Sequence, residues 1–215
     1  MTMRSLPTER SMSYCCEPLR SVAQSGFPSA EDWERCVPLK LVDTVTGRPP
    51  HQSTEVRFGW SPEYLHIRFV CQDDHVVSDF TERDQPLYEQ DVVELFIDEQ
   101  GDGSNYIELE VSPHNVVFDA LIHNNGDGSE LKADVTWQLE GLQTAVEVDR
   151  QGNRVYLIHI PASNFKSPLT KGVCWRVNAY RIDENVQGER EYQAWQPTGA
   201  VNFHLPARFG YFRLG

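Results

Sequence analysis

The sequence predicts an all-β protein, an antiparallel β-sandwich of the immunoglobulin-like or jelly-roll type. Three observations favour this fold class. Apolar and polar residues alternate with a period of two through many short segments, as they do in half-buried strands. Turn residues such as Gly, Pro and Asn separate these segments. Few stretches carry the 3.6-residue period of an amphipathic helix, which points to a sandwich or a barrel.

The first two predicted strands form a hairpin. Residues 55–60 lead through a Ser-Pro-Glu turn into residues 64–71. In the second segment Leu65, Ile67 and Phe69 share one face, which predicts that this face is buried.

The central predicted strands put acidic side chains on one face. In residues 91–98, Glu94 lies opposite the apolar side of the strand, and in residues 106–112 Glu108 and Glu110 do the same. If the two strands are neighbours, the three carboxylates share one sheet face. Further strands are predicted at residues 116–122, 144–148, 154–160, 173–182, 192–195 and 209–214.

The chain is interpreted as one domain with an N-terminal arm. Residues 1–29 are rich in Ser, Pro and Arg and have no apolar period, which predicts an extended arm that is disordered in part. Residues 30–215 are predicted to form a single sandwich domain, because all-β sandwiches often reach this size undivided. Four tryptophans are assigned to its core, namely Trp33, Trp60, Trp137 and Trp175.

The formal net charge of −13 restricts the partners. An acidic surface repels phosphate groups, so we expect neither nucleic acid nor a membrane as partner, whereas neutral sugars and cations are compatible. No apolar stretch is long enough to span a bilayer, and the first residues lack the apolar segment of a secretory signal. The expected location is the cytoplasm, or the periplasm or exterior if a leader precedes this sequence.

The five cysteines do not indicate a disulfide framework. Their number is odd, their spacing is scattered, and no pair has the spacing of a zinc finger. Cys71 and Cys174 lie in apolar runs and are predicted to be buried thiols. Cys15 and Cys16 lie near the start of the chain, where we expect exposure.

Three strings of residues carry a family resemblance. They are Tyr88-Glu-Gln-Asp-Val-Val-Glu-Leu-Phe-Ile-Asp98, then Asn105-Tyr-Ile-Glu-Leu-Glu-Val-Ser-Pro113 with Phe118-Asp119, and a tail with Trp195-Gln-Pro and Val201-Asn-Phe-His-Leu-Pro-Ala-Arg-Phe-Gly210. In order and spacing they resemble the family nine carbohydrate-binding modules. The resemblance covers about residues 30 to 215.

This resemblance implies a β-sandwich with a sugar site on one face, bound calcium in some members, and frequent linkage to glycoside hydrolases. Family members hold a sugar between two aromatic side chains, which correspond here to Tyr88 and to a position at or next to Phe203. The founding pattern has Trp at both positions, so this chain departs from it with smaller rings. Glu94 matches an acid that accepts hydrogen bonds from sugar hydroxyls.

The residues themselves offer suitable chemistry. A sugar site needs a flat aromatic face and polar groups that bond hydroxyls, and charge-assisted hydrogen bonds are the stronger ones. The candidates are Tyr88, Glu94, Glu108, Glu110, Arg176, Trp195, Phe203 and His204. The alternatives are a solvated sheet face with ordinary cross-strand pairs, aromatics that anchor loops to the core, and a hydrogen-bonded loop histidine.

Two acidic stretches are candidates for a calcium site, which rests on the resemblance alone. Asp73 and Asp74 are adjacent, and Asp98 and Asp102 lie in a Gly-rich stretch that lacks the EF-hand pattern. An ordinary hairpin turn is the alternative for the second stretch.

The predicted function is non-catalytic carbohydrate binding, associated with polysaccharide breakdown and with no cofactor required. The first alternative is a glycoside hydrolase with Glu94 and Glu108 as paired carboxylates. The second is a haem-binding sandwich, although Met1, Met3 and Met12, the only methionines, all lie in the arm. The third is a sandwich whose aromatics contact a protein partner.

Overall fold

The strands of this chain form one curled, continuous sheet. The computed structural model describes residues 13–19, 26–125 and 130–215. Within them the sheet runs in the order β10 (Gln143–Val148), β11 (Arg154–Pro161), β5 (Tyr64–Cys71), β4 (Thr54–Trp60), β1 (Ser13–Pro18), β14 (Gly210–Leu214), β12 (Cys174–Glu184), β6 (Val92–Asp98), β7 (Asn105–Val111), β8 (Val117–Asn124) and β9 (Leu131–Asp134). Three short strands pair at its side, namely β2 (Leu39–Lys40), β3 (Val42–Asp43) and β13 (Arg190–Ala194).

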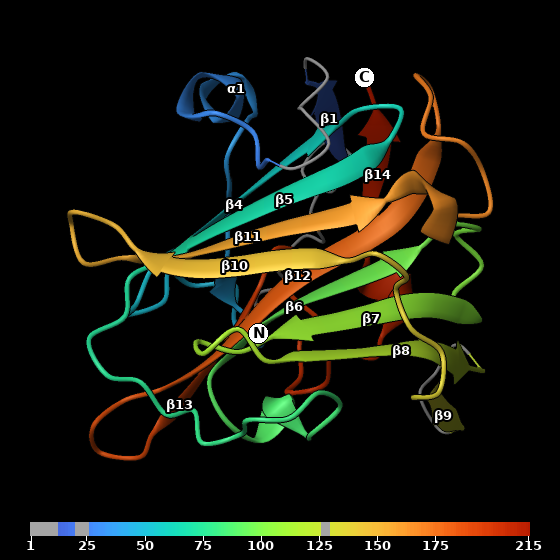
Figure 1. Cartoon of the computed structure of the whole chain (residues 1–215). Helices are drawn as coiled ribbons and strands as arrows, with labels where there is room; N and C mark the ends of the chain where they lie inside the picture. Colours follow the sequence, from blue (N-terminus) through green and yellow to red (C-terminus); the bar gives the residue numbers. More distant parts are fainter. Residues whose placement is uncertain (1–12, 20–25, 126–129) are drawn as a thin grey trace, which may run out of the picture.

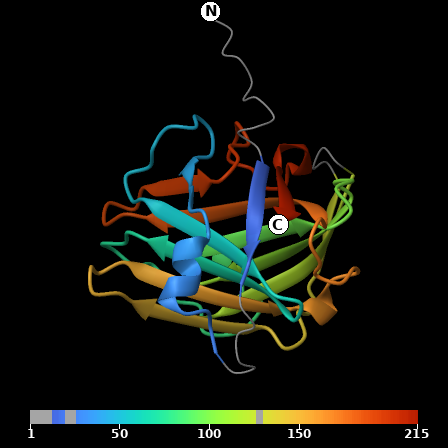
Figure 2. The same cartoon turned by 90° about the horizontal axis from the view of Figure 1, so that it is seen from above.

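The sheet curls so that two layers face each other (Figures 1 and 2). The strands β10, β11, β5 and β4 form the first layer, and those from β14 to β9 form the second. Alternating apolar side chains fill the space between them, with Phe58 and Ile67 from the first layer and Leu95 and Leu109 from the second. The β-sandwich predicted from the alternation is confirmed.

One strand joins the two layers, and it comes from the predicted arm. β1 pairs in parallel with β14 on one side and with β4 on the other, so the sheet is mixed rather than wholly antiparallel. Its Tyr14 and Cys16 are buried in the main core. The separation of residues 1–29 from the domain was therefore wrong at this strand, because two buried positions among Ser and Pro make too short a pattern to recognise. Met1, Met3 and Met12 lie outside the described residues.

Helices are few and short. The helix α1 (Ala30–Arg35), which the sequence pattern did not predict, begins after Ser29, and Ser29 and Asp32 cap each other. Its Trp33 packs with Leu19, Cys36 and Leu157 on the outer side of the first layer, where Figure 2 places α1. The other helices within residues 13–19, 26–125 and 130–215 are the single turns η2 (Leu87–Glu89), η3 (Ala162–Asn164) and η4 (Pro206–Arg208). Among the described residues, no helix is both long enough and apolar enough to cross a bilayer.

The burial predicted for the tryptophans and the cysteines is confirmed in part. Trp33, Trp60 and Trp175 are buried, and Trp137 packs against the core while half-buried. All five cysteines are free thiols. Cys71 is buried and Cys15 exposed as predicted, but Cys16 is buried and Cys174 exposed. The alternation explains both corrections, because Cys16 points between the layers and Cys174 precedes the inward-pointing Trp175.

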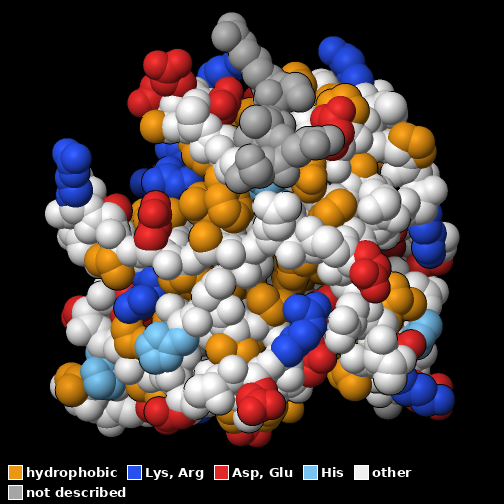
Figure 3. Space-filling view, in the orientation of Figure 1, with side chains coloured by type: hydrophobic (Ala, Val, Ile, Leu, Met, Phe, Trp, Pro, Cys, Tyr) orange, Lys and Arg blue, Asp and Glu red, His pale blue; other side chains and the backbone are white. Residues whose placement is uncertain are grey.

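The outer face of the second layer carries a second apolar cluster. It contains Phe96, Tyr106, Phe118 and Tyr180, which project from strands on the side away from the main core, and Phe209, which immediately precedes β14. Loops cover this face in part, which is why the strand β6 is buried along its whole length. On the face of the molecule seen in Figure 3, acidic and basic side chains are interspersed with small apolar patches.

Candidate functional site

A pocket of about 740 Å³ lies over the outer face of the second layer. The strands β6, β7 and β8 supply its base, β9 and β13 supply side walls, and the segments around η2 and residues 201–204 complete it. Apolar side chains gather at its rim, where Tyr88 is 51%, Leu131 41%, Val135 43% and Val201 60% exposed. Exposed apolar groups around a concave surface are typical of ligand-binding sites.

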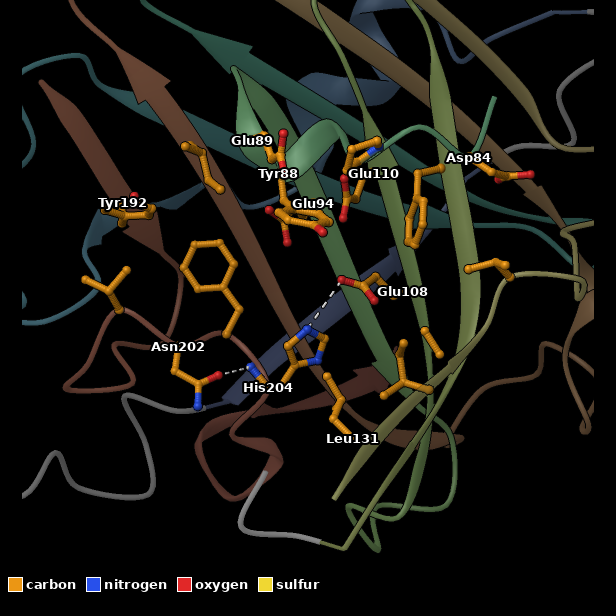
Figure 4. Close-up of a pocket in the computed structure, with 18 of the residues that line it drawn as sticks. Asp84, Tyr88, Glu89, Glu94, Glu108, Glu110, Leu131, Tyr192, Asn202 and His204 are labelled. Carbon is orange, nitrogen blue, oxygen red and sulfur yellow. Dashed lines mark hydrogen bonds and ion pairs between the residues drawn. The ribbon is translucent and has the colours of Figure 1, made fainter. Parts of the chain in front are cut away.

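Three glutamates meet inside this pocket. Glu94 on β6 and Glu110 on β7 are directly paired across the two strands, and Glu108 lies two residues away on the same face of β7. One carboxylate oxygen from each glutamate lies within 4.8 Å of a carboxylate oxygen of each of the other two. Figure 4 shows the three side chains converging, with Tyr88 beside Glu94. The shared face follows from the period of two, as the sequence predicted.

Burial changes the acidity of all three groups, since Glu94, Glu108 and Glu110 are 2%, 6% and 0% exposed. Burial raises the pKa of Glu108 to about 8. Burial, with a further contribution from Glu108, raises the pKa of Glu94 well above 4.5. The pKa of Glu110 is also raised, first by burial and then by the other two glutamates, against the opposing effect of the Tyr88 backbone N–H. Carboxylates this close stay protonated unless a cation or hydrogen-bond donors compensate them.

Little compensation comes from the described residues. Apart from the Tyr88 backbone N–H, whose influence on Glu110 falls short of a hydrogen bond of normal geometry, neither carboxylate oxygen of Glu110 has a partner among them, and nor does Oε1 of Glu94. His204 Nε2 lies 3.7 Å from Glu108 Oε1, and the Tyr106 hydroxyl lies 2.9 Å from His204 Nδ1 (Figure 4 draws the first contact). Burial lowers the pKa of His204 to about 4, so this imidazole is neutral at pH 7 and supplies no charge.

Aromatic rings occupy two sides of the pocket. Tyr88 in η2 leaves half of its surface open to solvent. Phe203 is nearly buried, because its ring stacks on Tyr180 at 4.1 Å and the Tyr180 hydroxyl donates a hydrogen bond to the Phe203 carbonyl at 3.0 Å. Tyr192 lies edge-on to Phe203 at 6.4 Å. Tyr88 is therefore a free stacking surface, and Phe203 is a fixed part of the wall.

Two predicted binding residues lie elsewhere. Trp195 is buried in the core between the layers, with its ring 6.2 Å from that of Tyr14. Arg176 lies beside Asp98, whereas Tyr180, four residues further along β12, is the partner of Glu94. The Nε–H of Arg176 donates to the Phe209 carbonyl at 2.8 Å, and the Arg176 guanidinium lies 4.4 Å from the centre of the Tyr211 ring. Neither residue lines the pocket, so neither is placed to contact a ligand bound there.

Several pocket residues were not predicted. The sequence pattern places Tyr192 in a strand without indicating a binding role, and it gives no signal for Asn202, whose side-chain oxygen accepts the His204 backbone N–H at 2.9 Å. The sequence analysis does not predict the wall formed by Leu131, Ala133 and Val135, although these apolar residues alternate with polar ones, because the segment is short and all four residues of β9 are exposed. Apolar residues in an exposed strand were the signal that could have found this wall.

The acidic stretches proposed for calcium have other partners. Asp98 accepts hydrogen bonds from the backbone N–H groups of Gln100, Gly101 and Gly103 at 3.1, 2.7 and 2.8 Å, and Asp102 accepts one from Ser104 at 2.8 Å. These carboxylates hold a turn in which Gly101 and Gly103 have positive φ, which is the hairpin alternative.

Asp73 lies in a different kind of cluster. Its carboxylate and those of Asp91 and Asp183 come within 4.8 Å of one another, but Arg181 contacts Asp183 and lies 4.0 Å from Asp73. The guanidinium supplies the positive charge that a calcium ion would bring, so these residues fit the ion poorly. Asp74 lines a separate cavity of about 850 Å³.

The fold and this pocket define a class of protein, the β-sandwich binding modules with a ligand site on one sheet face. The sequence model described as "Carbohydrate family 9 binding domain-like" matches residues 29–215. The chain belongs to this family, and the resemblance predicted from the sequence is confirmed.

Relatives and solved structures agree with this assignment. A protein of Arthroderma benhamiae described as "Extracellular protein" is 25% identical over 178 residues, which are 77% of this chain and 80% of the relative. A Bacteroides uniformis structure, described as that of a candidate carbohydrate-binding protein, has a TM-score of 0.75 at 17% identity and covers 94% of this chain and 99% of its own.

A family 9 carbohydrate-binding module from Caldicellulosiruptor kristjanssonii was solved with cellotriose and with glucose. The cellotriose complex has a TM-score of 0.67 at 14% identity and covers 93% of this chain and 92% of its own. The glucose complex has a TM-score of 0.67 at 13% identity, with coverage of 94% and 95%. At these identities the likeness concerns the fold.

Proposed function

We propose that this chain is a non-catalytic carbohydrate-binding protein whose ligand is a sugar ring in the pocket between Tyr88 and the three glutamates. One observation carries the proposal, namely that a single cavity combines an exposed aromatic ring with buried, unpartnered carboxyl oxygens. A pyranose matches both, since its C–H face packs on a flat ring and its hydroxyls donate hydrogen bonds.

Each pocket residue has a role in this proposal. Tyr88 stacks on the sugar, and Phe203 packs against it from the fixed wall. Glu94 and Glu110 accept hydrogen bonds from hydroxyls, because their oxygens have free lone pairs. His204 is held by Tyr106 and contacts Glu108, so it orients this carboxyl and borders the sugar. The structures with glucose and cellotriose, solved for another family member, support a glucose-type ring as the first ligand to test.

The glycosidase alternative receives less support from the geometry. Paired catalytic carboxylates flank the scissile bond and lie roughly 5 to 9.5 Å apart. In this pocket the three carboxylates form one cluster with oxygens within 4.8 Å, so they face one point on a ligand. The association with polysaccharide breakdown stays a prediction of the family resemblance.

The test is calorimetric titration of the full chain with glucose, cellobiose and cellotriose up to millimolar concentrations. We expect saturable binding of at least one of them with a stoichiometry of one. The proposal is contradicted if none of these ligands, and no other mono- or oligosaccharide on a glycan array, binds at these concentrations. Product release from chromogenic glycosides, compared between the chain and its Glu94→Gln variant, tests the glycosidase alternative in the same samples.

A further inference from the structure

The charges around the pocket are unbalanced. The ionisable side chains that line it are Asp84, Tyr88, Glu89, Glu94, Glu108, Glu110, Arg190, Tyr192 and His204. His204 is neutral at pH 7, and the guanidinium of Arg190 already bonds Glu184 at 2.9 Å and the Glu89 carbonyl. Among the described residues, no uncommitted positive charge therefore faces the three buried glutamates.

The glutamates also have unused hydrogen-bonding capacity. Both carboxylate oxygens of Glu110 and Oε1 of Glu94 are buried and lack hydrogen-bond partners within the described part of the chain. These atoms line the pocket and converge on one region of it (Figure 4). Buried carboxyl groups with no donors are costly, and the cost disappears when a ligand supplies positive charge and several N–H groups.

The spacing suits an ammonium group. Three acceptors placed at about 2.8 Å from an ammonium nitrogen, along its tetrahedral N–H directions, lie roughly 4.6 Å from one another. The carboxylate oxygens of Glu94, Glu108 and Glu110 come within 4.8 Å of one another, which accommodates this arrangement. Tyr88 adds an aromatic face at the same site, and such faces attract cations.

A bare metal ion would leave most of this pocket unexplained. The cavity measures about 740 Å³, within the range for organic ligands, and its wall is largely apolar, with Phe118, Ile122, Leu131 and Ile182. A divalent ion and its water shell need polar oxygen ligands and no apolar wall. The ligand that matches both halves of the pocket is an organic molecule with one cationic group.

We propose that the preferred ligand is an amino sugar with a free, protonated amine, whose ammonium group is bound by Glu94, Glu108 and Glu110. The inference rests on the proposed function and narrows it from sugars in general to basic sugars. The ring lies against Tyr88 and the apolar wall, and the ammonium points to the glutamates. Acetylation of the amine removes the charge and two donors, so the acetylated sugar loses this interaction.

Binding moves a proton as well. In the ligand-free pocket the glutamates retain protons at pH 7, since the pKa of Glu108 is about 8 and those of the other two are raised. The incoming ammonium stabilises a carboxylate, so one carboxyl group releases its proton to the buffer as the ion pair forms. A neutral sugar forms no ion pair and releases no proton.

The experiment is calorimetry of the full chain at pH 7 with D-glucosamine, N-acetyl-D-glucosamine and D-glucose, each in two buffers with different heats of ionisation. We expect the affinity for glucosamine to exceed that for glucose by about tenfold at least. The affinity for N-acetylglucosamine should not show this increase. The measured enthalpy should depend on the buffer for glucosamine only, because only that ligand releases a proton.

A Glu110→Gln variant tests the assignment to the glutamates. We expect the ratio of the glucosamine and glucose affinities to fall toward one, while the matched variant Glu147→Gln on the exposed strand β10 keeps the original ratio. Circular dichroism confirms that both variants are folded.

Four outcomes overturn the inference. If glucose or cellotriose binds as tightly as glucosamine, the preference is refuted while the proposed function stands. If Glu110→Gln leaves the ratio unchanged, the glutamates do not bind the amine. If glucosamine binding disappears with EDTA and returns with calcium chloride, a metal ion occupies the glutamates instead. If calcium alone binds and none of the sugars does, the proposed function fails too.

Discussion

Tyr88 is the pocket residue whose role can be tested with least risk to the fold. Its ring is half exposed and belongs to a single helical turn, so truncation removes a stacking surface without opening the core. We expect Tyr88→Ala to lower the affinity for the bound sugar about tenfold, because an aromatic contact of this kind contributes roughly 0.5–1.5 kcal/mol beyond its buried area. Calorimetric titration of the variant measures the change.

Tyr211 provides the matched control. It is 50% exposed, lies on β14, and contacts Arg176 rather than the pocket. Tyr211→Ala should leave sugar affinity unchanged. Equal losses in the two variants, or intact sugar binding in Tyr88→Ala, would argue that the aromatic rim serves a protein partner or nothing specific.

Alternation predicted the glutamates better than the aromatics. A period of two sends Glu94, Glu108 and Glu110 to one face whatever the rest of the fold does, so their convergence needed only the pairing of β6 with β7. Trp195 could not be placed in this way, because its direction depends on how the tail leaves β13 and enters the core. Arg176 was assigned to the correct face, but its distance from the site depends on strand register, which a single sequence does not contain.

At the scale of the elements, β1 and its continuation seal the junction between the layers. Trp60 donates its indole N–H to the Cys16 carbonyl at 3.1 Å, and the Leu19 N–H bonds the Trp60 carbonyl at 2.7 Å. The Leu19 side chain lies over Gly59, so close that an added Cβ would lie 2.4 Å from Leu19 Cδ1. Glycine is required at this point by close packing rather than by backbone conformation.

This contact predicts the effect of one methyl group. We expect Gly59→Ala to lower the free energy of unfolding by about 1–3 kcal/mol, the usual cost of overpacking, because Leu19 has to move off β4. Urea unfolding followed by tryptophan fluorescence measures the change. In the Leu19→Ala background, the same substitution should lower the free energy of unfolding by clearly less. If the effects of the two substitutions are purely additive in the double-mutant cycle, the proposed contact is contradicted.

For the whole molecule, the sandwich followed from the sequence but its closure did not. Strands of the central hairpins lie close in sequence, and turn residues between them specify antiparallel neighbours. The junction between the layers is instead formed by β1, which pairs in parallel with β14 and with β4. In sequence, β1 and β14 are separated by nearly the whole chain. Such long-range parallel pairs leave no local pattern, so the sequence predicted the sandwich but not the strand that joins its two layers.

The buried titratable groups predict how stability varies with pH. Burial lowers the pKa values of His66, His159 and His204 to about 3, 4 and 4, below the ordinary 6.5. The unfolded chain therefore binds more protons below pH 6.5, and this contribution to stability is lost as the pH falls from about 6.5 to 3. The three glutamates act in the opposite sense, because their pKa values are raised in the folded state. Their contribution is complete below about pH 4.5 and is lost as the pH rises toward 8.

The two sets overlap, so we expect maximum stability in the mildly acidic range, about pH 4.5 to 6.5, and a decline from pH 6.5 to 8. For each glutamate that is protonated in the folded state and ionised in the unfolded state, the free energy of unfolding falls by up to about 1.4 kcal/mol for every unit by which the pH rises. Urea denaturation at half-unit steps from pH 4 to 8.5 measures this curve. Replacing Glu94, Glu108 and Glu110 together by Gln should flatten the decline above pH 6.5, because glutamine does not titrate. The loss of stability at acidic pH should remain, because it arises from the histidines. A decline of unchanged slope in this triple variant would show that other groups, such as Asp183 with its pKa of about 7, control stability in that range.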